Sequence, residues 1–172
     1  MSVFLIGYRG SGKTTIGRRL ADRLWQTFVD ADELVVKQAA GRTIKEIFEI
    51  EGEAGFRDRE SAVVRELALL ADHVVALGGG AVLRPENREA LKAGGHKVIY
   101  LRCEPDELHR RIHADPATAA NRPALTALGG GIDEVKRLLA ERESIYRQVM
   151  TAELDVTNLS PEDATTYISR ML

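Results

Sequence analysis

The residues with the clearest chemical role form a glycine-rich segment near the N-terminus, residues 7–14 (GYRGSGKT). The spacing matches G-x-x-x-x-G-K-[ST], a loop whose glycines let backbone N–H groups surround phosphate oxygens. The ammonium of Lys13 would reach the β- and γ-phosphates of a nucleotide, and the hydroxyl of Thr14 would bind Mg²⁺. The segment follows the apolar run Val3–Ile6 and precedes a helical pattern, which is the strand–loop–helix setting that this loop requires. The alternative is an ordinary glycine-rich turn capped by a threonine.

A second candidate site consists of two carboxylates, Asp30 and Asp32, at the end of a predicted strand over residues 27–30. Side chains two residues apart point to the same side of a strand, and the carboxyl ends of parallel strands line the ligand crevice of an open sheet. One carboxylate could complete a Mg²⁺ shell, and the other could accept hydrogen bonds from a substrate hydroxyl. The alternative is that the two aspartates cap the helix that follows.

Two arginines fall on helix faces that are otherwise apolar. Arg142 lies in the apolar stripe of a helix predicted over residues 132–149, and Arg57 shares a face with Leu67 beside Glu60. A guanidinium that faces the interior is costly unless it is paired. The functional interpretation is a bidentate clamp on an anionic substrate, for which arginine suits a carboxylate better than lysine does. The structural interpretation is a side chain that reaches solvent at a helix end, or an internal Arg57–Glu60 pair.

Three consecutive glycines, Gly78, Gly79 and Gly80, follow the apolar run at residues 73–77. A tight turn rarely needs three glycines, so we expect this segment to bring backbone amides close to a ligand. The glycines at residues 129–131 and 94–95 lack a comparable setting and are interpreted as a hinge and a turn.

These segments would be positioned by alternating strands and helices, a pattern that predicts an α/β fold with a mostly parallel sheet. The predicted strands cover residues 3–6, 27–30, 73–77, 97–102 and 153–157. Helix starts are indicated by the capping-box spacing of Thr43 and Glu46, and by the prolines Pro85, Pro105 and Pro161, the last preceded by Ser160. The segment from about residue 112 to 131 has no sustained period and is typical of a lid or a disordered loop.

Composition excludes several classes of protein. The length of 172 residues corresponds to about one domain. Lys and Arg total 24 against 26 Asp and Glu, so no basic field covers the protein and we expect no binding to nucleic acid. No apolar run approaches the ~20 residues that span a bilayer, and the N-terminus does not resemble a signal peptide. The single cysteine, Cys103, indicates a reducing compartment. We therefore expect a cytoplasmic protein that binds no membrane.

Taken together, these residues resemble the shikimate kinase family of P-loop enzymes, which is related to the nucleoside monophosphate kinases. The resemblance covers essentially the whole chain, and it also rests on residues 56–60 (FRDRE), 121–123 (NRP) and 142–146 (RESIY). It implies a P-loop NTPase fold in which helices flank a five-stranded parallel sheet of order 2-3-1-4-5. One kinase domain would occupy residues 1–172, with substrate-binding helices at about 32–60 and a lid at about 112–128. The implied state is a monomer.

The resemblance further implies an activity and its cofactors. The reaction would be the ATP- and Mg²⁺-dependent phosphorylation of the 3-hydroxyl of shikimate, a step of aromatic amino-acid (chorismate) biosynthesis. Lys13, Asp32 and Arg122 would be the catalytic residues, with Asp32 holding the substrate hydroxyls as the candidate base and Arg122 swinging from the lid toward the transferring phosphate. Thr14 and Asp30 would serve the metal, with Asp30 acting through water.

Binding residues are implied in the same way. Arg57 and Arg142 would hold the substrate carboxylate, and Asp32 and the three glycines Gly78, Gly79 and Gly80 would complete the substrate site. The ATP contacts would come from the phosphate loop, the lid and two later positions, namely Gly10, Ser11, Gly12, Lys13, Thr14, Thr15, Arg111, Arg122 and Pro161. Arg111 would cover the adenine, with Pro161 on its other side.

A departure from the family pattern and two rival functions stay open. Trp25 stands where the family commonly has a glycine that ends the first helix in a left-handed conformation, so we expect this turn to be rebuilt. A related small-molecule kinase, such as a gluconate-type enzyme, would keep the phosphate loop but differ in how it uses Asp32, Arg57 and Arg142. A non-catalytic nucleotide-binding paralogue is the other rival, although neither D-x-x-G nor N-K-x-D of a GTPase switch occurs.

Overall fold

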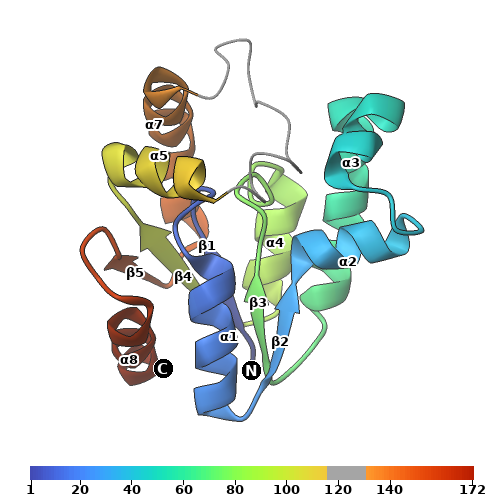
Figure 1. The fold of residues 1–172 in the computed structure, drawn as a ribbon. Helices are drawn as coiled ribbons and strands as arrows, with labels where there is room; N and C mark the ends of the chain where they lie inside the picture. The colour runs from blue at the N-terminus through green and yellow to red at the C-terminus, as the bar shows by residue number, and fades with distance from the viewer. Residues whose placement is uncertain (116–130) are drawn as a thin grey trace.

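The structure, a computed structural model, describes residues 1–115 and 131–172. Its centre is a five-stranded sheet in the order β2-β3-β1-β4-β5, in which every neighbouring pair is parallel (Figure 1). The predicted α/β class and strand order are confirmed. The strands are β1 (Val3–Ile6), β2 (Thr27–Asp30), β3 (His73–Ala76), β4 (Lys97–Arg102) and β5 (Ala152–Asp155).

Helices cover both faces of this sheet (Figure 1). One face carries α1 and α8, which pack against each other, and the other carries α3, α4 and α7. The helices are α1 (Lys13–Leu24), α2 (Ala31–Gln38), α3 (Ile44–Leu67), α4 (Pro85–Ala93), α5 (Pro105–Ala114), α7 (Ile132–Val149) and α8 (Pro161–Met171). None of the helices in the described ranges is both long enough and apolar enough to cross a membrane.

The central strand β1 is buried along its whole length, as expected for a parallel sheet covered on both faces. Two strand ends differ from the prediction by a few residues. β3 ends at Ala76, and β5 covers Ala152–Asp155 rather than residues 153–157. The chain leaves the sheet after Asp155 because Oδ1 of that residue accepts hydrogen bonds from the backbone N–H and the hydroxyl of Thr157, at 3.0 and 2.6 Å. This local turn replaces the next rung of the ladder.

Helix starts follow the predicted capping signals. Thr43 and Glu46 form a capping box at the start of α3, and the Ser160 hydroxyl accepts a hydrogen bond from Asp163 N–H at the start of α8. Pro85, Pro105 and Pro161 occupy the first turns of their helices, where a missing N–H costs nothing. α3 is interrupted at Gly52, whose φ of 69° divides it into two segments.

The expectation of a rebuilt turn at Trp25 is wrong. Trp25 adopts the left-handed conformation itself, with φ 55° and ψ 38°. The backbone N–H of Gln26 donates to the Ala21 carbonyl at 2.9 Å, which closes the helix end in the way a glycine would allow. The indole ring is 96% exposed, so no neighbour opposes the conformation and only the intrinsic backbone cost remains.

This geometry predicts that Trp25→Gly stabilises the protein by about 1 kcal/mol, because glycine adopts left-handed dihedral angles without a Cβ penalty. The free energy of unfolding in urea should be followed by circular dichroism, since Trp25 is the single tryptophan of the chain. Trp25→Ala is the control, and it should give little or no gain because alanine keeps the Cβ. Equal stabilisation by both variants would contradict the backbone explanation.

Candidate active site

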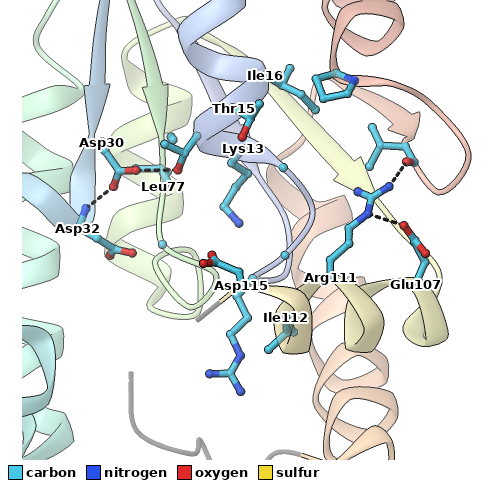
Figure 2. Close-up of a pocket in the computed structure, with 18 of the residues that line it drawn as sticks. Lys13, Thr15, Ile16, Asp30, Asp32, Leu77, Glu107, Arg111, Ile112 and Asp115 are labelled. Atoms are coloured by element: carbon cyan, nitrogen blue, oxygen red, sulfur yellow. Dashed lines mark hydrogen bonds and ion pairs between the residues drawn. The ribbon is translucent and has the colours of Figure 1, made fainter. Parts of the chain in front are cut away.

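The phosphate loop connects β1 to α1 and is shaped by backbone dihedral angles that favour glycine. Gly10 and Gly12 have φ of 83° and 92°, and Gly12 is the residue before the first turn of α1. The loop therefore ends at a helix N-terminus, where free backbone N–H groups and the helix dipole favour a bound anion. The Lys13 ammonium donates to the carbonyls of Gly7 and Tyr8, both at 2.9 Å, and projects into a cavity beside the loop (Figure 2).

Asp30 joins this loop to the start of α2. Its Oδ2 accepts a hydrogen bond from the Thr14 hydroxyl at 2.8 Å, and its Oδ1 accepts one from the backbone N–H of Asp32 at 3.0 Å. The capping role predicted as an alternative is thus correct for Asp30. The same carboxylate also accepts a hydrogen bond from Thr14, the residue predicted to bind the metal. A hydroxyl and a carboxylate beside a phosphate cradle are the hard oxygen ligands that Mg²⁺ takes together with substrate phosphates.

The three glycines after β3 allow side chains to approach the main chain closely. A Cβ at Gly80 would lie 2.5 Å from both terminal nitrogens of Arg57, and a Cβ at Gly78 would lie 2.8 Å from Oδ1 of Asp32. Gly79 is held from the other side, because its carbonyl accepts a hydrogen bond of 2.6 Å from the buried Tyr146 hydroxyl. Burial raises the pKa of Tyr146, so the phenol stays protonated and remains a donor.

The two arginines of the apolar faces are both buried, with 9% of Arg57 and 8% of Arg142 exposed. Arg57 donates to Oε2 of Glu60 at 2.6 Å, so the structural pair foreseen as an alternative exists. Arg142 has no carboxylate within ion-pair distance among the residues that the structure describes, and its guanidinium carbon lies 5.7 Å from the centre of the Tyr8 ring. A buried guanidinium in this setting favours an anionic ligand.

Two cavities meet at these residues. The larger, of about 1070 Å³, is lined by the phosphate loop, Asp30 and the segment after β5. The smaller, of about 50 Å³, is lined by Arg57, Arg142 and the three glycines. Four residues line both cavities and mark their junction, namely Arg9, Asp32, Ile44 and Gly78. Figure 2 shows Asp32 and Arg111 on opposite sides of the larger cavity, with the Lys13 ammonium between them.

Arg111 lines the larger cavity, and hydrogen bonds along one edge of its guanidinium hold it in place. Its Nε donates to Glu107 at 2.7 Å (Figure 2), and a terminal nitrogen donates to the carbonyl of Val156 at 2.9 Å. Hydrogen bonds from Arg110 and Arg111 lower the pKa of Glu107 to about 2, so this carboxylate is ionised at neutral pH. Because the donors on one edge are occupied, a flat face of the guanidinium is left for stacking.

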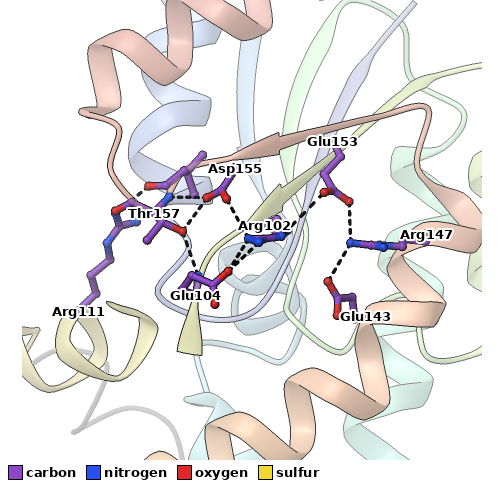
Figure 3. A network of polar contacts seen from close by, with 9 residues as sticks. Arg102, Glu104, Arg111, Glu143, Arg147, Glu153, Asp155 and Thr157 are labelled. Atoms are coloured by element: carbon purple, nitrogen blue, oxygen red, sulfur yellow. Dashed lines mark hydrogen bonds and ion pairs between the residues drawn. The ribbon is translucent and has the colours of Figure 1, made fainter. Parts of the chain in front are cut away.

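The segment that Arg111 contacts is itself fixed by a polar network (Figure 3). The backbone N–H of Glu104 donates to the Thr157 hydroxyl at 3.1 Å, and that hydroxyl donates to Asp155. Arg102 completes the network with hydrogen bonds to Glu104 and Asp155. The wall between β5 and α8 is therefore held to the ends of β4 and β5.

The structure brings most of the predicted residues to these two cavities. Those at the larger cavity are Gly10, Gly12, Lys13, Thr14, Thr15, Asp30, Asp32, Gly78, Arg111 and Pro161. Those at the smaller cavity are Asp32, Arg57, Gly78, Gly79, Gly80 and Arg142. Ser11 differs, because it is fully buried and does not line either cavity. Arg122 and most of the predicted lid at about 112–128 lie outside the described residues.

Three residues of the site were not assigned a role from sequence. Arg9 occupies an unspecified position of the loop motif, so the motif carries no information about it. Glu107 has a spacing to Arg110 and Arg111 that could have signalled a helical ion-pair cluster. Tyr146 matches the family pattern but fits an apolar stripe equally well, and only the fold shows that its hydroxyl reaches Gly79.

The Tyr146 hydrogen bond gives a prediction about stability. Tyr146→Phe leaves the Gly79 carbonyl without this donor in a buried position, so the free energy of unfolding should fall by about 1–3 kcal/mol. The measurement is urea denaturation of both proteins. Tyr167→Phe is a matched control, because Tyr167 is 47% exposed on α8 and should lose little. An unchanged midpoint for Tyr146→Phe would contradict the structural role of the bond.

Comparison with known proteins places the chain in a family. A family model described as shikimate kinase matches residues 9–172. The shikimate kinase of Thiobacillus denitrificans is 44% identical over 159 residues, which cover 92% of this chain and 83% of the relative. The shikimate kinase of Symbiobacterium thermophilum is 41% identical over 172 residues, which cover 100% of this chain and 96% of the relative.

Solved structures agree with this assignment. A shikimate kinase from Acinetobacter baumannii in complex with shikimate superposes with a TM-score of 0.90 at 35% identity, covering 99% of this chain and 91% of that chain. A gluconokinase from Sinorhizobium meliloti superposes with a TM-score of 0.59 at 18% identity, which shows a shared fold alone. With a family model that spans nearly all of its length and relatives above 40% identity, the chain belongs to the shikimate kinase family.

Proposed function

We propose that this chain carries out the family's reaction, phosphoryl transfer from ATP to the 3-hydroxyl of shikimate, at the junction of the two cavities. ATP occupies the larger cavity, with its phosphates in the loop beside Lys13 and its adenine against the face of Arg111. The observation that carries the proposal is the position of Asp32, which lines both cavities and lies where a hydroxyl from one side would meet a phosphate from the other.

The acid is held by its carboxylate in the smaller cavity. At about 50 Å³ this cavity admits the carboxylate end rather than the whole molecule, so the ring extends to the junction and its hydroxyls face Asp32. Arg142, which has no carboxylate partner among the described residues, and Arg57 supply the charge. Gly80 keeps the backbone close to Arg57 and leaves its guanidinium room to turn toward the ligand.

Transfer then requires alignment and charge neutralisation. Asp32 orients the 3-hydroxyl in line with the γ-phosphorus and accepts its proton as the new O–P bond forms. The bond between the γ-phosphorus and the bridging oxygen of ADP breaks, and the charge on the leaving phosphates is balanced by Lys13 and the loop N–H groups. The products are shikimate 3-phosphate and ADP. We retain Arg122 in the role that the family resemblance implies for it, a lid arginine that approaches the transferring phosphate.

Thr14 and Asp30 are the residues that would hold the metal, Asp30 through water. When bound, Mg²⁺ neutralises charge on the β- and γ-phosphate oxygens. The 2.8 Å contact between Thr14 and Asp30 already places a hydroxyl and a carboxylate together at the mouth of the loop. Asp30 also caps α2, so its position does not depend on the metal.

A single kinase domain over residues 1–172, with substrate-binding helices at about 32–60 and a lid at about 112–128, fits a site whose described residues come from both ends of the chain. We propose that the enzyme is a monomer, the state that the family resemblance implies. We place the enzyme in the cytoplasm, where its buried single cysteine would stay reduced.

The decisive experiment is an assay of ADP release with ATP, Mg²⁺ and a panel of hydroxy acids that includes shikimate and gluconate. We expect release that depends on shikimate, with the product identified by phosphorus NMR as the 3-phosphate. Preferred release with gluconate would favour the related-kinase alternative. The absence of release with every acceptor, despite ATP binding, would favour the non-catalytic alternative.

A further inference from the structure

Arg9 lies between the two cavities without a role in the phosphate cradle. It is one of the four residues that line both cavities. Its Nε is buried, and no hydrogen-bond partner for that atom lies in the described part of the chain. No carboxylate of those ranges lies within ion-pair distance of its guanidinium either, although most other arginines there form such pairs.

The surroundings of Tyr8 place the Arg9 charge at the acid end of the site. Burial raises the pKa of Tyr8, the positive charges of Arg9 and Arg142 oppose that rise, and the negative charge of Glu134 adds to it. Arg142 lies over the Tyr8 ring, at 5.7 Å from the ring centre. Arg9 follows Tyr8 in the chain and lines the smaller cavity together with Arg142, which is a buried cation there.

The main chain of Arg9 is anchored to the substrate loop. A Cβ at Gly79 would lie 3.3 Å from the backbone nitrogen of Arg9 and 3.4 Å from the carbonyl oxygen of Gly7. The Gly79 carbonyl is in turn held by Tyr146. The backbone of Arg9 is therefore held in place beside the three glycines. Because the backbone is fixed, the side chain needs little reorganisation to contact a ligand at the junction of the two cavities.

The charged side chains that line the smaller cavity are three arginines and two carboxylates, so the lining favours an additional anion. Arg57 is paired with Glu60, whereas Arg9 and Arg142 have no carboxylate partner in the described ranges. A desolvated guanidinium is stabilised far more by a carboxylate or phosphate than by water at the rim. Because Arg9 and Arg142 both line the smaller cavity, where the acid is proposed to bind, the anion that could reach both is the carboxylate of the acceptor rather than the nucleotide phosphates.

We propose that Arg9 is a third arginine of the acceptor site, and that its guanidinium binds the carboxylate of the bound acid together with Arg57 and Arg142. This inference rests on the proposed function and adds a specificity residue supplied by the phosphate loop itself. The loop would then hold the nucleotide with its backbone and the acceptor acid with one of its side chains.

The test is Arg9→Met, which removes the charge and keeps the length of the side chain. The KM for shikimate should rise about tenfold or more, because a charge-assisted hydrogen bond to the acid is lost. The KM for ATP should change less than about twofold, because the loop backbone and Lys13 are unaltered. Arg9→Lys should recover part of the loss, since it restores the charge without the planar fork.

A neutral analogue of shikimate, with a primary alcohol in place of the carboxylate, separates this role from the others. Wild type and Arg9→Met should use that analogue with nearly equal kcat/KM if Arg9 binds the carboxylate. A similar loss of kcat with both acceptors would instead assign Arg9 to the transferring phosphate and overturn the inference. Unchanged kinetics with shikimate would overturn it as well.

Controls keep the outcomes distinct. Arg19→Met removes one positive charge from α1 outside both cavities, where Arg19 is half-exposed and paired with Glu162, and it should leave both KM values unchanged. ATP binding by Arg9→Met, measured by calorimetry, reports whether the loop is intact. If the wild type itself shows no shikimate-dependent ADP release, the proposed function fails. If the wild type is active and Arg9→Met has the same kinetic constants for shikimate, only the role of Arg9 is rejected.

Discussion

Asp32→Ala should lower kcat by about 10²- to 10⁴-fold, the range expected when a positioned general base is removed. The affinity for ATP should remain close to that of the wild type, because the phosphates are held by the loop N–H groups and Lys13. The contact between Asp32 and Asp30 uses the backbone N–H of Asp32, which the substitution retains. Steady-state kinetics and calorimetric binding of ATP measure the two quantities separately.

Asp58→Ala is a suitable control for Asp32→Ala. Asp58 is an exposed carboxylate on α3 that pairs with Arg84, so its removal changes the net charge equally without reaching either cavity. Its kcat should match the wild type. A variant of Asp32 that binds ATP poorly but turns over normally would contradict the role proposed for this carboxylate.

Arg142→Met should raise the KM for shikimate by about 30-fold or more, in line with the loss of one partner from a buried charge pair. The KM for ATP should stay within about twofold of the wild type. The free energy of unfolding should fall by less than about 2 kcal/mol, because no described carboxylate is paired with Arg142 and the contact with the Tyr8 ring is the interaction that is lost. Kinetics and urea denaturation on the same preparations test both parts.

Arg57 should behave differently although it lies in the same cavity. Arg57→Met removes one partner of Glu60, which is 3% exposed, so the variant should lose both shikimate affinity and about 3 kcal/mol of stability. Arg57→Lys keeps a charge beside Glu60 and should lose mainly affinity, since an ammonium cannot reproduce the planar fork. Equal effects of Arg57→Lys on the KM for ATP and for shikimate would contradict the clamp.

Local sequence signals were sufficient for much of this fold. The phosphate loop, the capping box at Thr43 and the prolines at helix starts depend on neighbours a few residues away. Short sequence segments are therefore enough to predict the local structure at these places. The positions of β1, β3 and most of β4 also followed from apolar runs, because strands covered on both faces are largely apolar. The predicted end of β5 differs from the observed one because a turn closed by the Asp155 side chain competes with continued strand pairing. The sequence of this segment does not show which of the two conformations is more stable.

Other features depend on partners that are distant in the chain. Helical spacing could not decide whether Arg57 pairs with Glu60 or faces a ligand, since either arrangement is possible for an arginine on that face of the helix. Gly80 needs its missing Cβ because Arg57 lies there, a reason that only the folded arrangement provides. The left-handed Trp25 was unexpected because the penalty it carries is small and is tolerated where the side chain meets only solvent.

The place of Trp25 also limits how the enzyme can be observed. The indole lies beyond the last turn of α1, and the nucleotide loop precedes the first turn of the same helix, a separation of roughly 18 Å for twelve residues. Its emission already comes from a fully hydrated ring. Tryptophan fluorescence will therefore be insensitive to occupancy of either cavity, and titrations that follow tryptophan emission will need a reporter placed elsewhere.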